Sequence, residues 1–281
     1  MDYAKAIAAM GTALGPQVVE ACRDLFDAEQ RDLAARVAPL AIDCAYGPHE
    51  RHRLDLYRAS DERDLPVVLF VHGGGFRLGD KGDNGSWQNA AVARTMAEAG
   101  FLGAAMNYRL LPDARWPEGG EDVIQAVEWL HSNAARHGGD PDRIVIVGTS
   151  AGAVHIATAL KLNTNLPVAG AVLLSGLYGY TPLDVKDEPY YGRDDEYAGK
   201  MPREAVASTN LPLLVACAQF DPPRFQAEFV GLMGERLDRH GHLPRAVTLS
   251  GHNHYSMAMH IGTSDRRLSD EIISFVRALS T

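Results

Sequence analysis

Short runs of apolar residues recur along the chain and are separated by longer stretches with helical spacing. Pro66–Val71 reads Pro-Val-Val-Leu-Phe-Val, and an unbroken apolar run of this kind is typical of a strand buried on both faces. Similar runs predict further strands, and an alternating segment at 53–57 predicts a half-exposed strand. The predicted strands cover residues 53–57, 66–71, 101–106, 144–147, 168–174, 211–216 and 246–249.

Helical patterns fill the intervals between most of these strands. They cover residues 90–99, 120–137, 151–162, 224–239 and 264–279. Regular alternation of strand and helix predicts an α/β protein with a mostly parallel central sheet and helices on both faces. Ligands of such sheets bind at the carboxyl ends of the strands. We therefore expect functional residues to follow strands directly.

Two segments stand outside this alternation. Residues 1–38 have apolar positions at helical spacing, including Val19, Cys22 and Phe26, which predicts N-terminal cap helices. Residues 176–208 are rich in Tyr, Asp, Gly and Pro, and a connection of that length is usually functional, so we expect a lid. A chain of 281 residues that is 46% hydrophobic can bury one large core, so 1–281 is predicted to be a single domain with a small helical cap.

The charge and the cysteine content narrow the function classes. A net charge of −9 disfavours nucleic-acid partners, because an acidic surface repels phosphates. No apolar window is long enough for a membrane span, and the N-terminus lacks the pattern of a signal peptide. Three widely spaced cysteines suit reduced thiols better than disulfides. We therefore expect a cytoplasmic protein with no membrane or nucleic-acid partner.

Gly148-Thr149-Ser150-Ala151-Gly152 matches the G-x-S-x-G pattern. It follows the predicted strand 144–147 and precedes the predicted helix 151–162, which is the context of a nucleophile elbow. Such a turn holds its serine in a strained backbone conformation at the start of a helix, where developing negative charge is favoured. Because the pattern alone is weak, its assignment depends on the partners of Ser150.

A glycine-rich loop, His72-Gly73-Gly74-Gly75-Phe76, follows the predicted strand 66–71. Bare backbone N–H groups at a strand end can hold the oxyanion that forms when a nucleophile attacks an ester. No lysine stands where a phosphate-binding loop would need one, so a phosphate site is disfavoured. We predict an oxyanion hole formed by the N–H groups of Gly74, Gly75 and Ala151, with His72 bracing the loop.

In α/β proteins with a nucleophile elbow, the catalytic residues follow one another along the chain in the order nucleophile, acid, histidine. This order places the acid after the predicted strand 211–216. Asp221, followed by two prolines, is the candidate. The histidine must lie in the loop between the last strand and the last helix, which offers His252 and His254. We prefer His254, which lies deeper in the loop, with His252 as the alternative, and we consider His260 a packing residue.

Two further expectations concern ligands. Two histidines at i and i+2 suggest metal, but neither a carboxylate nor a cysteine accompanies them at ligand spacing, so no metal site is predicted. Aromatic residues near the motifs are candidates for lining a substrate pocket. The predicted substrate-binding residues are Phe76, Trp87, Tyr178 and Tyr191.

The motifs together resemble those of the hormone-sensitive-lipase-like (bacterial family IV) carboxylesterases. The resemblance rests on Val71–Phe76, Asn107-Tyr108-Arg109-Leu110, Gly139–Ile144 and Gly148–Ala153, and it covers residues 65–160 well and 211–260 more loosely. It implies an α/β-hydrolase fold, hydrolysis of short-acyl carboxylic esters without a cofactor, the triad Ser150, Asp221 and His254, and an oxyanion hole at Gly74, Gly75 and Ala151.

Two alternatives remain open. Ser175-Gly176-Leu177-Tyr178 followed by Thr181-Pro182-Leu183 resembles the kynurenine formamidase branch of the same superfamily, whose members cleave an aryl formamide. A catalytically inactive binding protein on the same fold is the other. The edge strand of such a sheet is also a candidate for pairing into a homodimer.

Overall fold

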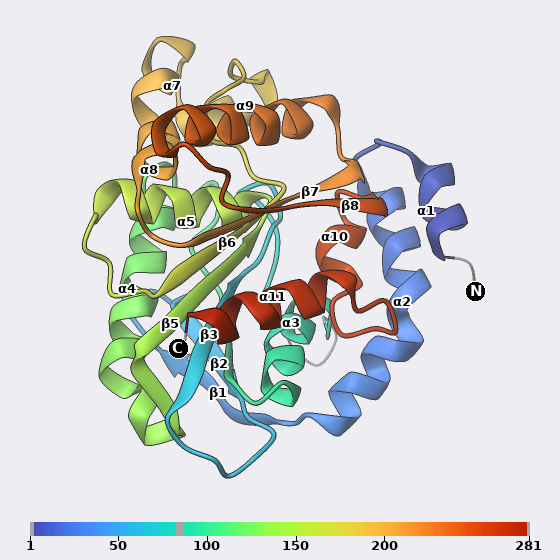
Figure 1. The fold of residues 1–281 in the computed structure, drawn as a ribbon, viewed down its shortest axis with the longest axis vertical. Helices are drawn as coiled ribbons and strands as arrows, with labels where there is room; N and C mark the ends of the chain where they lie inside the picture. Colours follow the sequence, from blue (N-terminus) through green and yellow to red (C-terminus); the bar gives the residue numbers. More distant parts are fainter. Residues whose placement is uncertain (1–2, 83–86, 280–281) are drawn as a thin grey trace.

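The computed structural model describes residues 3–82 and 87–279. Eight strands form one sheet in the order β1-β2-β4-β3-β5-β6-β7-β8 (Figure 1). Strands β3 to β8 pair in parallel with one another, whereas β2 pairs antiparallel with both β1 and β4, so the predicted mostly parallel sheet is confirmed. The strands are β1 (Pro39–Ala45), β2 (Arg53–Tyr57), β3 (Leu65–Val71), β4 (Leu102–Met106), β5 (Gly139–Thr149), β6 (Gly170–Leu174), β7 (Leu213–Phe220) and β8 (Arg245–Asn253).

The helices fall close to their predicted positions. Helix α5 (Ala151–Leu162) has the predicted bounds, and 120–137 is divided into α4 (Glu118–Asn133) and the 3-10 turn η1 (Ala134–His137). The other long helices are α3 (Trp87–Glu98), α9 (Pro223–His240) and α11 (Arg267–Ala278), with the short α10 (Ser256–Met259) before α11.

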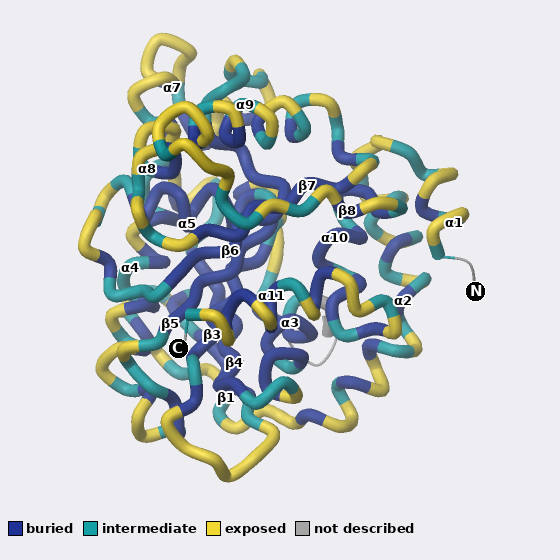
Figure 2. Tube along the Cα trace, viewed as in Figure 1, coloured by how far each residue is buried: buried dark blue, intermediate teal, exposed yellow. Residues whose placement is uncertain are grey.

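Apolar side chains of each central strand alternate between two cores. Along β3, Val67 and Leu69 pack with residues of α4, α5 and α9, whereas Val68 and Phe70 pack with residues of α3, α10 and α11. Each face of the sheet is therefore covered by helices, and the central strands form the most deeply buried part of the molecule (Figure 2). This two-sided burial explains the unbroken apolar runs of the sequence.

The two segments predicted as cap and lid are helical. The described part of the first segment, residues 3–38, contains α1 (Tyr3–Met10) and α2 (Pro16–Arg36), which lie beside α10 and β8 (Figure 1). Residues 176–208 contain the turn η2 (Val185–Asp187) and the short helices α6 (Glu188–Tyr191), α7 (Asp194–Lys200) and α8 (Arg203–Ser208). Within residues 3–82 and 87–279, no helix combines the length and the apolar character that crossing a bilayer requires.

Candidate active site

The candidate residues gather where four parallel strands end. Ser150 follows β5, the glycine loop follows β3, Asp221 follows β7 and His254 follows β8. The register of the sheet explains why Asp221 and His254 lie together. Phe220 of β7 pairs with Asn253 of β8, so the next residue of each strand leaves the sheet at the same level. The sequence therefore brings Asp221 and His254 side by side although 33 positions separate them.

A continuous hydrogen-bonded chain links the three side chains. The Ser150 hydroxyl donates to Nε2 of His254 at 2.9 Å, and Nδ1 of His254 donates to Oδ1 of Asp221 at 2.7 Å. Ser150 has a φ of 52° and a ψ of −119°, a strained conformation at the strand-to-helix turn. The ring of Phe225 lies 4.2 Å from that of His254 and restricts the imidazole.

Asp221 is fully buried, and donors surround its carboxylate. Oδ2 accepts hydrogen bonds from the backbone N–H of Ala218 at 2.7 Å and from the hydroxyl of Ser175 at 2.6 Å. Burial by itself raises the pKa of Asp221, but the bonds from His254, Ser175 and Ala218 outweigh it and leave the pKa below its ordinary value. The acid is therefore held as a carboxylate that can orient a protonated imidazole.

The glycine loop lies against the nucleophile. Gly74 and Gly75 have φ values of 132° and 58°, and Gly73–Gly75, Ser150 and Ala151 all line one cavity. A Cβ at Gly74 would collide with the carbonyl oxygen of Leu78, so this turn requires glycine. The three predicted oxyanion donors thus belong to residues that face the same space as Ser150.

His72 supports this loop from below. Its Nδ1 donates to the carbonyl of Gly73 at 2.6 Å, its ring stacks on Tyr108 at 4.3 Å, and the Tyr108 hydroxyl donates to the His72 carbonyl at 2.9 Å. Burial lowers the pKa of His72 to about 4, so the ring is neutral at physiological pH. These contacts match the bracing role expected for His72.

The cavity has a volume of about 630 Å³, within the usual size range of small-molecule sites. Of the four residues predicted to line it, Phe76 does so. Tyr178 and Tyr191 do not: both are fully buried, Tyr178 in the core beneath α4 and α5 and Tyr191 behind Phe76, at a ring distance of 5.5 Å. That expectation was wrong for both, because the tyrosine-rich segment packs inward. Trp87 begins α3, and its side chain lies outside the described part of the structure.

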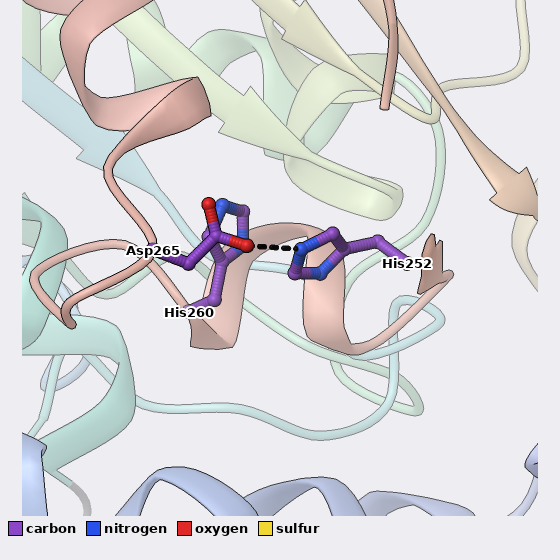
Figure 3. Close-up of side chains that lie close together, drawn as sticks. All are labelled: His252, His260 and Asp265. Atoms are coloured by element: carbon purple, nitrogen blue, oxygen red, sulfur yellow. Dashed lines mark hydrogen bonds and ion pairs between the residues drawn. The ribbon is translucent and has the colours of Figure 1, made fainter. Parts of the chain in front are cut away.

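The alternative base, His252, faces a different group of side chains. Its Nε2 lies 3.0 Å from Oδ2 of Asp265, and its ring lies 4.0 Å from that of His260 (Figure 3). Potential ligand atoms of these three residues lie within 4.8 Å of one another, so they could hold a metal ion. The sequence argument overlooked Asp265, because a turn of the chain rather than close spacing brings it to His252.

Arg267 alters the chemistry of this group. Its guanidinium donates to both oxygens of Asp265, at 2.9 and 2.5 Å, and its Nη2 lies 3.1 Å from Nε2 of His252. A cation thus already neutralises the carboxylate that a metal would need. The arrangement is that of an ion-pair network that fixes the loop carrying His254.

Sequence reasoning missed two contributions to the site. Ser175 directly follows β6, so the rule that functional residues follow strands could have identified it. Helix α2 lines the cavity through Pro16, Val19, Glu20 and Arg23, and no motif marks these positions. Lys186 and Asp187 of the segment 176–208 line it as well.

The chain is similar in sequence to known esterases. The family model described as BD-FAE matches residues 54–173. Esterase LipQ of Mycobacterium tuberculosis is 35% identical over 161 residues, which cover 56% of this chain and 36% of that protein. Isoprenylcysteine alpha-carbonyl methylesterase ICME of Arabidopsis thaliana is 37% identical over 118 residues, or 42% of this chain and 26% of that protein. The matches thus span about a third or less of these relatives.

Solved structures extend the likeness to nearly the whole chain. Esterase B from Lactobacillus rhamnosis superposes with a TM-score of 0.73 at 19% identity, covering 100% of this chain and 97% of the other. The hyperthermophilic esterase from the archaeon Pyrobaculum calidifontis superposes with a TM-score of 0.68 at 25% identity, covering 93% and 94%. The chain therefore has the α/β-hydrolase fold, and part of its sequence is similar to known esterases.

Proposed function

We propose that the chain is a serine carboxylesterase that hydrolyses small carboxylic esters through an acyl-enzyme. The observation that carries the proposal is the hydrogen-bonded chain from Ser150 through His254 to Asp221 at the wall of a cavity. Its similarity to esterases adds support. The strained backbone of Ser150 adds further support, because such strain is concentrated at functional sites.

The proposed reaction has two halves. His254 takes the proton of Ser150 as the hydroxyl attacks the ester carbonyl, and the N–H groups of Gly74, Gly75 and Ala151 hold the oxyanion. His254 then protonates the leaving alkoxide. Water, activated by His254, next cleaves the acyl-enzyme and regenerates Ser150. Asp221 keeps the imidazole in the useful tautomer throughout.

A panel of p-nitrophenyl esters of increasing acyl length tests this proposal, with Ser150→Ala as the reference. We expect turnover of the short esters, labelling by a fluorophosphonate probe, and loss of both in Ser150→Ala. If the wild type neither turns over an ester nor takes up the probe, the binding-protein alternative replaces the proposal. If N-formylkynurenine is cleaved faster than the best ester, a formamidase replaces it.

We also propose that 1–38 and 176–208 form the cap of the single domain 1–281. Both segments contribute to the wall of the cavity, through Val19 and Arg23 of α2 and through Lys186 and Asp187. Deleting 1–38 should enlarge the cavity and weaken the discrimination between short and long acyl chains. An unchanged ester panel for the shortened chain, provided that it folds, would contradict this role.

A homodimer is proposed through an edge of the sheet. β1 is one edge, and its Leu40 and Ile42 are 42% and 64% exposed. Exposed apolar edge strands tend to pair. Light scattering on the eluted protein should give twice the chain mass, and Ile42→Lys should lower it; a monomeric wild type would refute the dimer.

A cytoplasmic location is proposed on the state of the cysteines. Cys22, Cys44 and Cys217 are all free thiols, which suits a reducing compartment. Fractionation of the producing cells with an antibody against the chain tests this location.

A further inference from the structure

Helix α2 brings charged as well as apolar side chains to the cavity. Val19 and Arg23 stand one turn apart on the same face of the helix, and both line the cavity. The helix is anchored to the loop that carries His254. Gln30 donates to the carbonyls of Met259 and Ile261 at 2.9 and 2.7 Å. Arg23 therefore has a fixed position relative to the candidate triad.

One donor of the half-buried Arg23 side chain is not satisfied by the protein. Its Nε is shielded from solvent and has no hydrogen-bond partner within the described ranges. Two other arginines of the same helix each hold a carboxylate: Arg31 pairs with Asp27 at 2.6 Å and Arg36 with Glu98 at 2.9 Å. Because a desolvated charged donor without an acceptor costs free energy, a ligand that supplies the acceptor gains affinity at this position.

The other charges on the cavity wall are engaged or exposed to water. Lys186 pairs with Asp184 at 3.0 Å, and Asp187 pairs with Arg224 at 2.5 Å. Glu20 is exposed, so water and salt screen its charge. Among the described residues of the cavity wall, Arg23 is therefore the Lys or Arg side chain for which no carboxylate partner is found.

We propose that Arg23 binds a carboxylate of the substrate, so that the enzyme prefers esters with a free carboxylate, such as half-esters of dicarboxylic acids. The planar guanidinium forms paired, charge-assisted hydrogen bonds with a carboxylate. The inference rests on the proposed ester hydrolysis. In that reaction water adds OH to the acyl group and H to the alcohol, and the bound carboxylate is unchanged.

Matched pairs of esters test the preference. Monoethyl esters of succinic, glutaric and adipic acid are compared with the ethyl esters of the corresponding monoamides, which keep the size and lose the charge. 4-Acetoxybenzoate and 4-acetoxybenzamide form a second comparison, with the charge on the alcohol side. Proton release at constant pH gives kcat and KM for every ester.

For at least one pair we expect the wild type to favour the charged ester about tenfold or more in kcat/KM, the size of one charge-assisted contact. Arg23→Met should abolish this preference, because KM should rise far more for the charged ester than for the neutral one. Arg23→Lys should retain part of the preference. Arg31→Met, which removes a charge elsewhere on α2, should retain all of it.

Two results would overturn the role of Arg23. One is a wild type without preference in any pair, and the other is an Arg23→Met variant that loses activity equally on charged and neutral esters. Both leave the proposed ester hydrolysis intact as long as neutral esters are cleaved in a Ser150-dependent way. Failure of the hydrolysis itself would appear separately, as no turnover of either ester of a pair.

Discussion

The Ser175 hydroxyl donates a 2.6 Å hydrogen bond to one carboxylate oxygen of Asp221, while His254 donates to the other oxygen. Ser175 directly follows β6, and Asp221 follows β7, the neighbouring strand. Ser175 thus fixes one oxygen of the carboxylate, and the other oxygen accepts the hydrogen bond from the imidazole. We infer that Ser175 is a positioning residue for the proposed triad, acting through Asp221.

Replacing Ser175 by Ala tests this inference. We expect kcat/KM for a short ester to fall about tenfold, because one hydrogen bond to a buried charge is lost. The same loss raises the pKa of Asp221, and because Ser175 does not line the cavity, the fall should appear in kcat with KM nearly unchanged. Steady-state kinetics with a short ester at pH 7.5 give kcat and KM separately.

Ser175→Gly is the matched control. Ser175 has a φ of 49°, which glycine adopts without strain. If the hydroxyl matters, Ser175→Gly is as slow as Ser175→Ala. If Ser175→Gly instead keeps wild-type kinetics, backbone geometry is the cause and the positioning role is lost.

A pair of histidine variants separates the two candidate bases. His254→Ala should lower kcat by about 10⁴-fold or more, the cost of removing a member of such a triad. His252→Ala should keep kcat within about tenfold but lower the free energy of unfolding by roughly 1–3 kcal/mol, because His252 is buried and bonded to Asp265. Steady-state kinetics and urea unfolding decide; equal losses of kcat would contradict the assignment.

The glycine loop offers a contrast between neighbours. A Cβ at Gly74 would collide with the backbone of Leu78, whereas a Cβ at Gly75 has open space around it. Gly74→Ala should therefore shift the proposed oxyanion donors and lower kcat by roughly 10²- to 10³-fold. Gly75→Ala should lower the free energy of unfolding by about 1–2 kcal/mol, the strain of a positive φ in alanine, and should lower kcat less than Gly74→Ala does. The prediction fails if Gly75→Ala is the slower enzyme.

Buried, periodic elements could be predicted from the sequence. Helix α5 has its predicted bounds because a strong turn starts it and a continuous apolar face supports it. Strand β1 was missed because, unlike the central strands, it lies at an edge and none of its residues is buried. β5 begins at Gly139, five residues before the predicted start, since pairing of Leu65 with Gly139 extends it through polar positions that periodicity does not mark.

Two rules predicted the candidate site: functional residues follow strands, and the catalytic residues follow one another along the chain as nucleophile, acid and histidine. Both rules point to Ser150, Asp221 and the loop of His252 and His254. The choice of base depends on register, which pairs Phe220 with Asn253 and brings the following residues together. The prediction that Tyr178 and Tyr191 line the cavity failed for a related reason. Local composition does not tell which way a side chain points, and Tyr191 points into the core.

Three buried histidines predict how stability depends on pH. Burial lowers the pKa of His72 to about 4 and that of His155 and of His260 to about 3, from an ordinary 6.5. In the unfolded chain these three histidines therefore become protonated below pH 6.5, whereas in the folded chain they stay neutral down to pH 3–4. The free energy of unfolding should therefore be highest above pH 6.5 and fall as the pH drops, by roughly 2 kcal/mol per histidine at pH 5.

Urea unfolding at pH 7.5 and pH 5.0 measures this loss, and His155→Leu isolates one share of it. The ring of His155 lies among the rings of Phe76, Tyr108 and Tyr190, so leucine suits most of its surroundings and removes only the 3.3 Å contact between Nδ1 and the Tyr190 hydroxyl. The difference in unfolding free energy between the two pH values should be about 2 kcal/mol smaller in the variant than in the wild type. Any general destabilisation by the substitution cancels, because each chain is compared with itself. An identical difference in both chains would mean that His155 is protonated in the folded state.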